Sequence, residues 1–101
     1  MRERNVAAHL KTEWSKIGGE HRKLAWENRA HAPDLLLLHR KLCTNVLVET
    51  KRPGKDARAG QAREIARLRE SGLDVRVVNT VEQADALVDE FRAKLHDRGL
   101  L

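Results

Sequence analysis

The chain has 101 residues, of which 41% are hydrophobic and 35% are charged, and its formal net charge is +5. A chain of this length builds one modest core, so we expect a single domain over residues 1–101. Its one cysteine excludes an internal disulfide, its N-terminus lacks the apolar segment of a signal peptide, and its longest apolar run is too short to span a membrane. We therefore expect a cytoplasmic protein that has no membrane partner.

The first half of the chain predicts a helix followed by a β-hairpin. Apolar residues at helical spacing predict a helix over residues 2–17, which a Gly-Gly pair ends. Residues 20–27 predict a polar edge strand. The continuous apolar run 35–38 is typical of a strand covered on both faces. Because its connector to a second predicted strand, residues 45–51, is short, we expect an antiparallel hairpin.

The second half predicts a helix, a strand and a helix. Residues 58–71 have an apolar face of helical period, and Gly72 is suited to end that helix. Residues 73–79 predict a strand, and the apolar stripe of the final helix runs from beyond Thr80 to Leu95. The order α-β-β-β-α-β-α describes an α/β fold, a small mixed sheet flanked by helices, in which the last strand has a parallel neighbour.

Positive charge is concentrated in one segment. Residues 51–69 hold seven lysine or arginine residues and two acidic residues, which accounts for the whole net charge. Such a segment suits a polyanion such as nucleic acid, although a solvated helix face would have the same composition.

Two carboxylates and an ammonium group are predicted to meet at the open end of the hairpin. Side chains alternate along a strand, so Glu49 and Lys51 project from one face. Asp34 precedes the first hairpin strand, beside the end of the second. The register of the hairpin can be written as the sum of the two residue numbers that pair across it. A sum of 83 or 85 places Asp34 opposite Glu49 or Lys51 and on their face, whereas a sum of 84 places it on the other face unless a bulge redirects it. Taken alone, Glu49 and Lys51 could also form a surface ion pair.

This arrangement indicates a divalent metal ion. Neighbouring carboxylates repel one another unless a cation neutralises them, and oxygen ligands suit Mg²⁺ or Mn²⁺. The expected ligands are the carboxylates of Asp34 and Glu49 and the backbone carbonyl of Thr50. Gln61 lies one turn before Ile65 on the inward face of the following helix. It could orient a water molecule or a phosphate there, and ordinary capping or solvent exposure is the alternative.

With PD at 33–34, ETK at 49–51, PG at 53–54 and Gln61, the chain resembles the PD-(D/E)xK nuclease superfamily. The helix ending in KIGG, the stretch VETKRPG and the later LRESGLDVRVVNTVEQADAL narrow the resemblance to the virus-type replication-repair nuclease (VRR-NUC) family. The pattern is similar to the stand-alone phage form of that family over residues 2–92. It implies a restriction-endonuclease-like αβββαβ core with a C-terminal helix.

The resemblance implies an endonuclease that hydrolyses phosphodiester bonds of DNA with a divalent metal. It assigns metal binding to Asp34 and Glu49, and it assigns to Lys51 the positioning and activation of the attacking water. Gln61 supports the site.

The resemblance also implies partners and one further ligand. The family uses a glutamate of its first helix, for which Glu3 is the best match, with Glu13 and Glu20 as substitutes. Stand-alone members resemble nucleases that act on branched DNA, including four-way junctions, as homodimers. A phage protein of this kind would act in the cytoplasm of the bacterial host.

Loops next to the predicted site carry residues suited to contact flanking phosphates. These are Arg29, His31, Arg52, Lys55 and Arg58. Contacts of this kind position DNA without reading its sequence and make binding sensitive to salt.

The chain departs from the family pattern at two places. His31 stands where the family commonly has glycine, and a loop role, a phosphate contact and a metal contact are all open for it. The helix that carries Gln61 lacks the family's small polar cap and proline, with Arg58, Ala59 and Gly60 in their place. Two alternatives to an active nuclease follow. One is a non-catalytic DNA-binding relative that uses segment 51–69, and the other is a small α/β protein with an unrelated partner.

Overall fold

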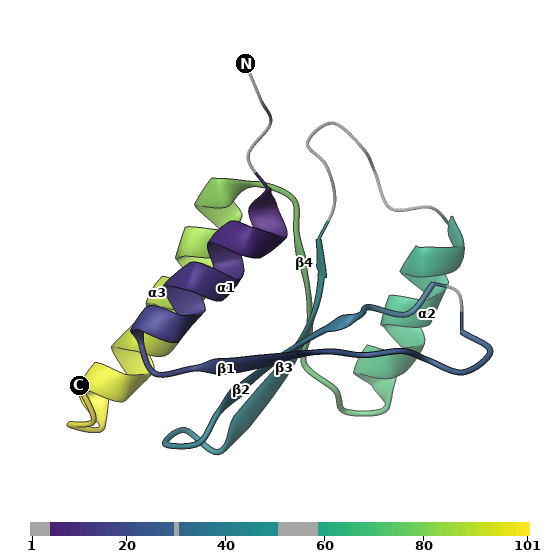
Figure 1. Cartoon of the computed structure of the whole chain (residues 1–101). Helices are drawn as coiled ribbons and strands as arrows, with labels where there is room; N and C mark the ends of the chain where they lie inside the picture. The colour runs from purple at the N-terminus through teal and green to yellow at the C-terminus, as the bar shows by residue number, and fades with distance from the viewer. Residues whose placement is uncertain (1–4, 30, 51–58) are drawn as a thin grey trace.

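The elements follow one another in the predicted order, α-β-β-β-α-β-α. The structure, a computed structural model, describes residues 5–29, 31–50 and 59–101 (Figure 1). Its helices and strands are α1 (Val6–Lys16), β1 (Glu20–Lys23), β2 (Leu35–His39), β3 (Thr44–Thr50), α2 (Ala59–Glu70), β4 (Val75–Val78) and α3 (Val81–Asp97).

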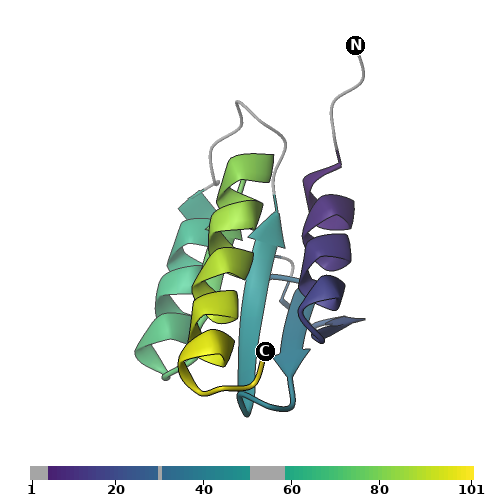
Figure 2. The same ribbon diagram turned by 90° about the vertical axis from the view of Figure 1, so that its left-hand side faces the viewer.

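The four strands form one mixed sheet in the order β1-β2-β3-β4. The pairs β1–β2 and β2–β3 are antiparallel, whereas β4 runs parallel to β3. Helices α1 and α3 cover one face of the sheet and α2 covers the other (Figures 1 and 2). The predicted α/β fold is thus confirmed, with its hairpin, its parallel last strand and its C-terminal helix.

The largest errors among the predicted boundaries concern the first helix and the first strand. The first helix begins at Val6 rather than at residue 2, because Asn5 is its N-cap and the Asn5 side chain accepts a hydrogen bond from the backbone N–H of Ala8. The first strand ends at Lys23 rather than at residue 27. An apolar stripe identifies the face of an element, whereas capping and pairing decide its ends. Within the described residues, no helix is both long and apolar enough to cross a lipid bilayer.

The larger core lies between the sheet and the helices α1 and α3. Its centre is Trp14, which is fully buried and packs edge-to-face against Phe91 at 5.2 Å between ring centroids. The Trp14 indole N–H lies 3.0 Å from the carbonyl of Glu20 and 3.1 Å from that of Leu38, so it joins α1 to β1 and β2. A Cβ at Gly19 would lie 2.1 Å from the indole nitrogen, so only glycine fits this close approach.

A smaller core lies on the other face, under α2. Ile65 of α2 is buried there together with Leu47 of β3 and Val75 of β4. The partly buried Trp26, from the chain between β1 and β2, packs against the same cluster. This smaller core sets the position of α2 on the sheet and therefore the position of Gln61.

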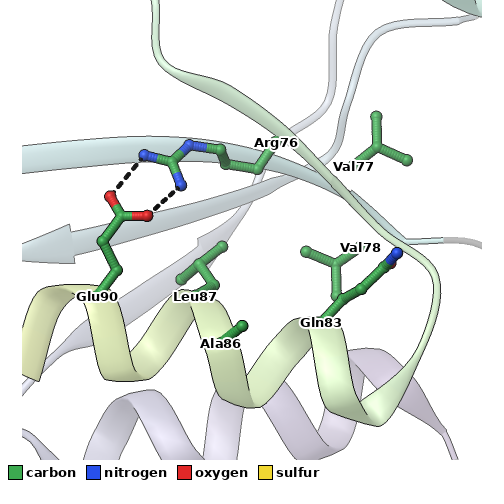
Figure 3. A pocket seen from close by; sticks show the side chains of 7 residues that line it. All are labelled: Arg76, Val77, Val78, Gln83, Ala86, Leu87 and Glu90. Atoms are coloured by element: carbon green, nitrogen blue, oxygen red, sulfur yellow. Dashed lines mark hydrogen bonds and ion pairs between the residues drawn. The ribbon is translucent and has the colours of Figure 1, made fainter.

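The edge strand β4 is tied to α3 by an ion pair. Both terminal nitrogens of the Arg76 guanidinium donate to the carboxylate of Glu90, each at 2.9 Å (Figure 3). Arg76 also donates to Asp74 at 2.6 Å. A shallow pocket lies beside this pair, between β4 and the first turns of α3, with Leu87 and Gln83 among its lining residues.

Candidate active site

The register of the hairpin decides which carboxylates share a face. Leu35 pairs with Val48 and Leu36 with Leu47, so the paired numbers add up to 83. The predicted odd sum is confirmed. Asp34 comes one residue before β2, and this register places it across from Glu49. Because side chains alternate, both positions belong to the face of Leu36 and Leu47, which α2 covers.

Glu49 and Gln61 are in contact. The side-chain amide of Gln61 donates from Nε2 to Oε1 of Glu49 at 3.1 Å. Glu49 is the second-last residue of β3 and Gln61 the third residue of α2, and both are partly buried. A hydrogen bond to a carboxylate fixes its orientation. The structure therefore brings together two of the residues that the sequence assigned to one site.

The backbone on both sides of Asp34 is fixed by hydrogen bonds. The carbonyl of Asp34 accepts from the backbone N–H of Leu24 at 2.7 Å, and the carbonyl of Pro33 accepts from the indole N–H of Trp26 at 2.5 Å. Pro33 is fully buried, whereas Asp34 itself is exposed. Asp34 is thus exposed to solvent next to the start of β2, and hydrogen bonds fix its backbone.

His31 packs against the first turn of α2. A Cβ at Gly60 would lie 2.8 Å from both Cδ2 and Nε2 of the His31 ring, closer than real Cβ atoms come. The imidazole therefore occupies space that any side chain at position 60 would fill. His31 and Gly60 are both departures from the family pattern, and they lie against each other. The absence of a side chain at Gly60, next to Gln61, leaves room for the His31 ring. The sequence signal for this contact is the glycine inside a predicted helix.

Glu64 is a residue that the sequence analysis missed. It is a buried residue of α2, and its Oε1 lies 3.4 Å from Nη2 of Arg67 and 3.7 Å from Nη1 of Arg29. Arg29, which was expected to contact DNA, is thus also linked to α2. The sequence signal that could have identified Glu64 is its position, one helical turn after Gln61 and next to the apolar Ile65.

The other predicted ligands fall into two groups. Thr50 ends β3 and pairs with Val78 of β4, so its position next to Glu49 is held by the sheet. The substitutes for the first-helix glutamate lie elsewhere. Glu20 stands at the opposite end of β1 from Asp34 and pairs with Arg40, and Glu13 pairs with Lys16. Neither is brought to Glu49.

Several predicted site residues lie outside the described residues. They are Glu3, Lys51, Arg52, Lys55 and Arg58. Helix α1, which follows Glu3 in the chain, begins at the end of the molecule where β3 ends (Figures 1 and 2).

A second group of potential metal ligands lies away from Glu49. Within the described parts of the chain, one set of three such side chains has donor atoms within 4.8 Å of one another, namely His9, Glu13 and Asp85. They belong to α1 and α3, on the opposite face of the sheet from Gln61. His9 already pairs with Asp85 at 2.7 Å, and Lys16 pairs with Glu13 at 2.6 Å and lowers the pKa of the Glu13 carboxyl.

Comparisons with known proteins were made at the levels of family, sequence and structure. No family model matches the chain, and no curated protein matches it. A solved structure described as a VRR_NUC domain is similar to it, with a TM-score of 0.74 and 34% sequence identity. The match covers 83% of this chain and 90% of the other. The likeness thus extends over most of both chains at the level of sequence as well as fold, and the chain belongs to the VRR-NUC family.

Proposed function

We propose that the protein is a divalent-metal-dependent DNA endonuclease that acts on branched DNA, such as four-way junctions, as a homodimer. Membership of the VRR-NUC family supports a nuclease-type activity. The observation that carries the proposal is the hydrogen bond from Gln61 to Glu49, at a register that turns Asp34 and Glu49 to the same face.

The donor set at this end of the sheet fits a hard cation. The carboxylates of Asp34 and Glu49 and the carbonyl of Thr50 are oxygen donors, which Mg²⁺ and Mn²⁺ prefer. These residues would hold the ion, and Glu3 is a further candidate ligand. A bound ion of this kind supplies a Lewis acid that polarises the scissile phosphate and lowers the pKa of water.

The side chains around the ion have separate tasks in this proposal. Gln61 holds the carboxylate of Glu49 in one orientation and adds no charge to the two acids. Lys51, two residues after Glu49, would position the attacking water and balance the charge that develops on the phosphate. Arg29, His31 and the basic residues Arg52, Lys55 and Arg58 would contact phosphates on either side of the cleaved bond.

The branched substrate and the dimer are proposed from the family resemblance. Two copies related by a twofold axis would place two active sites on one branched substrate. The basic segment 51–69 supports a nucleic-acid partner, since it carries the whole net charge of the chain.

The first prediction concerns the two carboxylates. Glu49→Gln and Asp34→Asn are each expected to abolish Mg²⁺- or Mn²⁺-dependent cleavage, because each removes a charged oxygen donor. Both should leave the fold intact, and the melting temperature without metal should stay equal or rise, since one of two neighbouring charges is gone. The measurement is cleavage of junction, flap, single-stranded and duplex DNA, with circular dichroism of each variant.

The control is Glu70→Gln, which removes an exposed carboxylate from the far end of α2 and should leave cleavage unchanged. Unchanged turnover in both site variants would discard the site. DNA binding that is insensitive to EDTA, without products from any substrate, would favour the non-catalytic relative instead.

A further inference from the structure

A pocket one turn along α2 from Gln61 shares Arg29 with the proposed phosphate contacts, and the catalytic proposal gives no role to its other lining residues. Its volume is about 290 Å³, and it is lined by Trp26, Arg29, Glu64, Arg67, Leu68 and Ser71. One wall comes from the chain between β1 and β2, which continues to Asp34. The other wall is α2, where Glu64 follows Gln61 by one turn. The pocket is therefore built from the same two segments that position the site.

The charges of this pocket favour an anion. The side chain of Glu64 is 8% exposed, whereas those of Arg29 and Arg67 are 58% and 60% exposed. Both guanidinium groups approach the same oxygen of the one buried carboxylate, so the group carries an excess positive charge. A guanidinium has five N–H donors, and each contact with Glu64 is made by a single terminal nitrogen. Glu64 thus pairs with both arginines, and because each arginine side chain is more than half exposed, N–H donors remain for a ligand such as phosphate.

Trp26 adds an aromatic wall. Its indole N–H donates to the carbonyl of Pro33, so its polar group is already bonded. What it offers to a ligand is the apolar surface of the ring, on which any nucleobase can stack. The same hydrogen bond connects the pocket to the site, because Pro33 directly precedes Asp34.

We propose that this pocket binds one unpaired nucleotide of the DNA substrate, with its phosphate on Arg29 and Arg67 and its base against Trp26. The proposal rests on the proposed function and names the feature of branched DNA that is recognised. A base inside a duplex must be unstacked and unpaired to enter a pocket, whereas a base at a branch or bulge is already free of its partner. Recognition of this kind selects DNA by structure and not by sequence.

The test measures binding separately from cleavage. Fluorescence anisotropy in EDTA compares the dissociation constants of a fully paired duplex and of the same duplex with one unpaired nucleotide. The wild type should bind the second DNA about tenfold more tightly, as expected for one base stacked on an aromatic ring. Trp26→Leu and Arg67→Ala should each bring that ratio close to one. Arg98→Ala, an exposed arginine beyond the end of α3, is the matched control and should keep the wild-type ratio.

Trp26 also packs against the smaller core, so its loss could disturb the fold. Trp26→Phe keeps an aromatic face and should keep the ratio, and the exposed Arg67→Ala gives a second readout that does not touch the core. A wild-type ratio of one, or a tenfold ratio that persists in both Trp26→Leu and Arg67→Ala, would overturn the proposal.

The same proteins separate this inference from the proposed function. If Glu49→Gln loses metal-dependent cleavage while the wild-type binding ratio is one, the nuclease site stands and the pocket is wrong. If Glu49→Gln cleaves like the wild type while the ratio depends on Trp26, the pocket stands and the catalytic site is wrong. Absence of any DNA binding overturns both.

Discussion

At the residue scale, the candidate site depends on an amide next to a carboxylate. Gln61 donates to Glu49 across the gap between α2 and the end of β3, and a glutamate at this position would add a third negative charge instead of a donor. In the proposed site, the neutral amide would therefore orient Glu49 without adding to the repulsion between carboxylates that a bound cation offsets. Orientation of a metal-binding carboxylate by a neighbouring side chain changes metal affinity and activity strongly.

The second prediction follows from this contact. Gln61→Ala should lower kcat by roughly ten- to a hundredfold and raise the Mg²⁺ concentration needed for half-maximal activity, because Glu49 loses a partner that orients it. Gln61→Glu should be impaired more, since it adds a negative charge beside Glu49. A metal titration of cleavage measures both effects, with thermal melting as a check on the fold. Wild-type kcat and metal dependence in Gln61→Ala would show that the amide is only a structural contact.

At the element scale, the two helical layers depend on different contacts. α1 and α3 share a large core with Trp14 at its centre, whereas α2 rests on the small cluster around Ile65. The parallel edge strand β4 is held to α3 by the pair between Arg76 and Glu90. The Arg76 guanidinium holds the pKa of the Glu90 carboxyl below its ordinary value of 4.5, and Lys94 lowers it further.

The third prediction concerns the pH dependence of that pair. The pKa of the Glu90 carboxyl is lower in the folded state than in the unfolded chain. The ion pair with Arg76 therefore stabilises the fold fully at pH values above the ordinary pKa of 4.5. The contribution is lost as the pH falls through the lower folded-state pKa. Glu90→Gln should therefore melt at a lower temperature than the wild type near neutral pH, and the difference should shrink under acid.

The expected difference is less than about 1 kcal/mol, since the pair is partly exposed to solvent. Melting curves from about pH 7 to about pH 3 measure it. Glu27→Gln, an exposed position in the chain between β1 and β2 and outside any helix, is the control. A melting difference between Glu90→Gln and the wild type that stays constant over this range would contradict the assignment.

At the scale of the whole molecule, the excess positive charge follows the strand that carries Glu49 directly in the sequence. The basic segment 51–69 follows β3 directly and continues into α2, so it adjoins Glu49 and Gln61 along the chain. The opposite face of the sheet is occupied by α1 and α3 (Figure 2). A DNA strand that reaches Asp34 and Glu49 would therefore meet the segment with the excess positive charge.

The fourth prediction tests this electrostatic term. Arg52→Ala combined with Lys55→Ala should weaken binding to every duplex alike, because contacts with phosphates carry no sequence information. The slope of log K against log salt should become shallower by up to about two, one for each lost phosphate contact. Lys41→Ala combined with Arg98→Ala removes the same charge from exposed positions elsewhere and should leave the slope nearly unchanged. A loss that depends on DNA sequence would contradict the prediction.

The sequence by itself determined the element order and the hairpin, and it made the face of Asp34 and Glu49 depend on the pairing register, which the structure then set at a sum of 83. These features depend on periodicity and on turns, which are local properties of the chain. Because side chains alternate along a strand, the pairing register decides which face Asp34 occupies. The prediction that Asp34 shares the face of Glu49 could therefore be checked from the register alone.

Only the tertiary structure decided how α2 meets the end of β3 and the chain before β2. Three contacts of α2 join segments that are separated in the sequence. They are the ion pair of Glu64 with Arg29, the packing of His31 against Gly60 and the hydrogen bond from Gln61 to Glu49. Their geometry depends on where the small core around Ile65 places the helix. A periodic pattern shows which side of a helix is apolar, but the docking position of that side comes from packing against residues far along the chain.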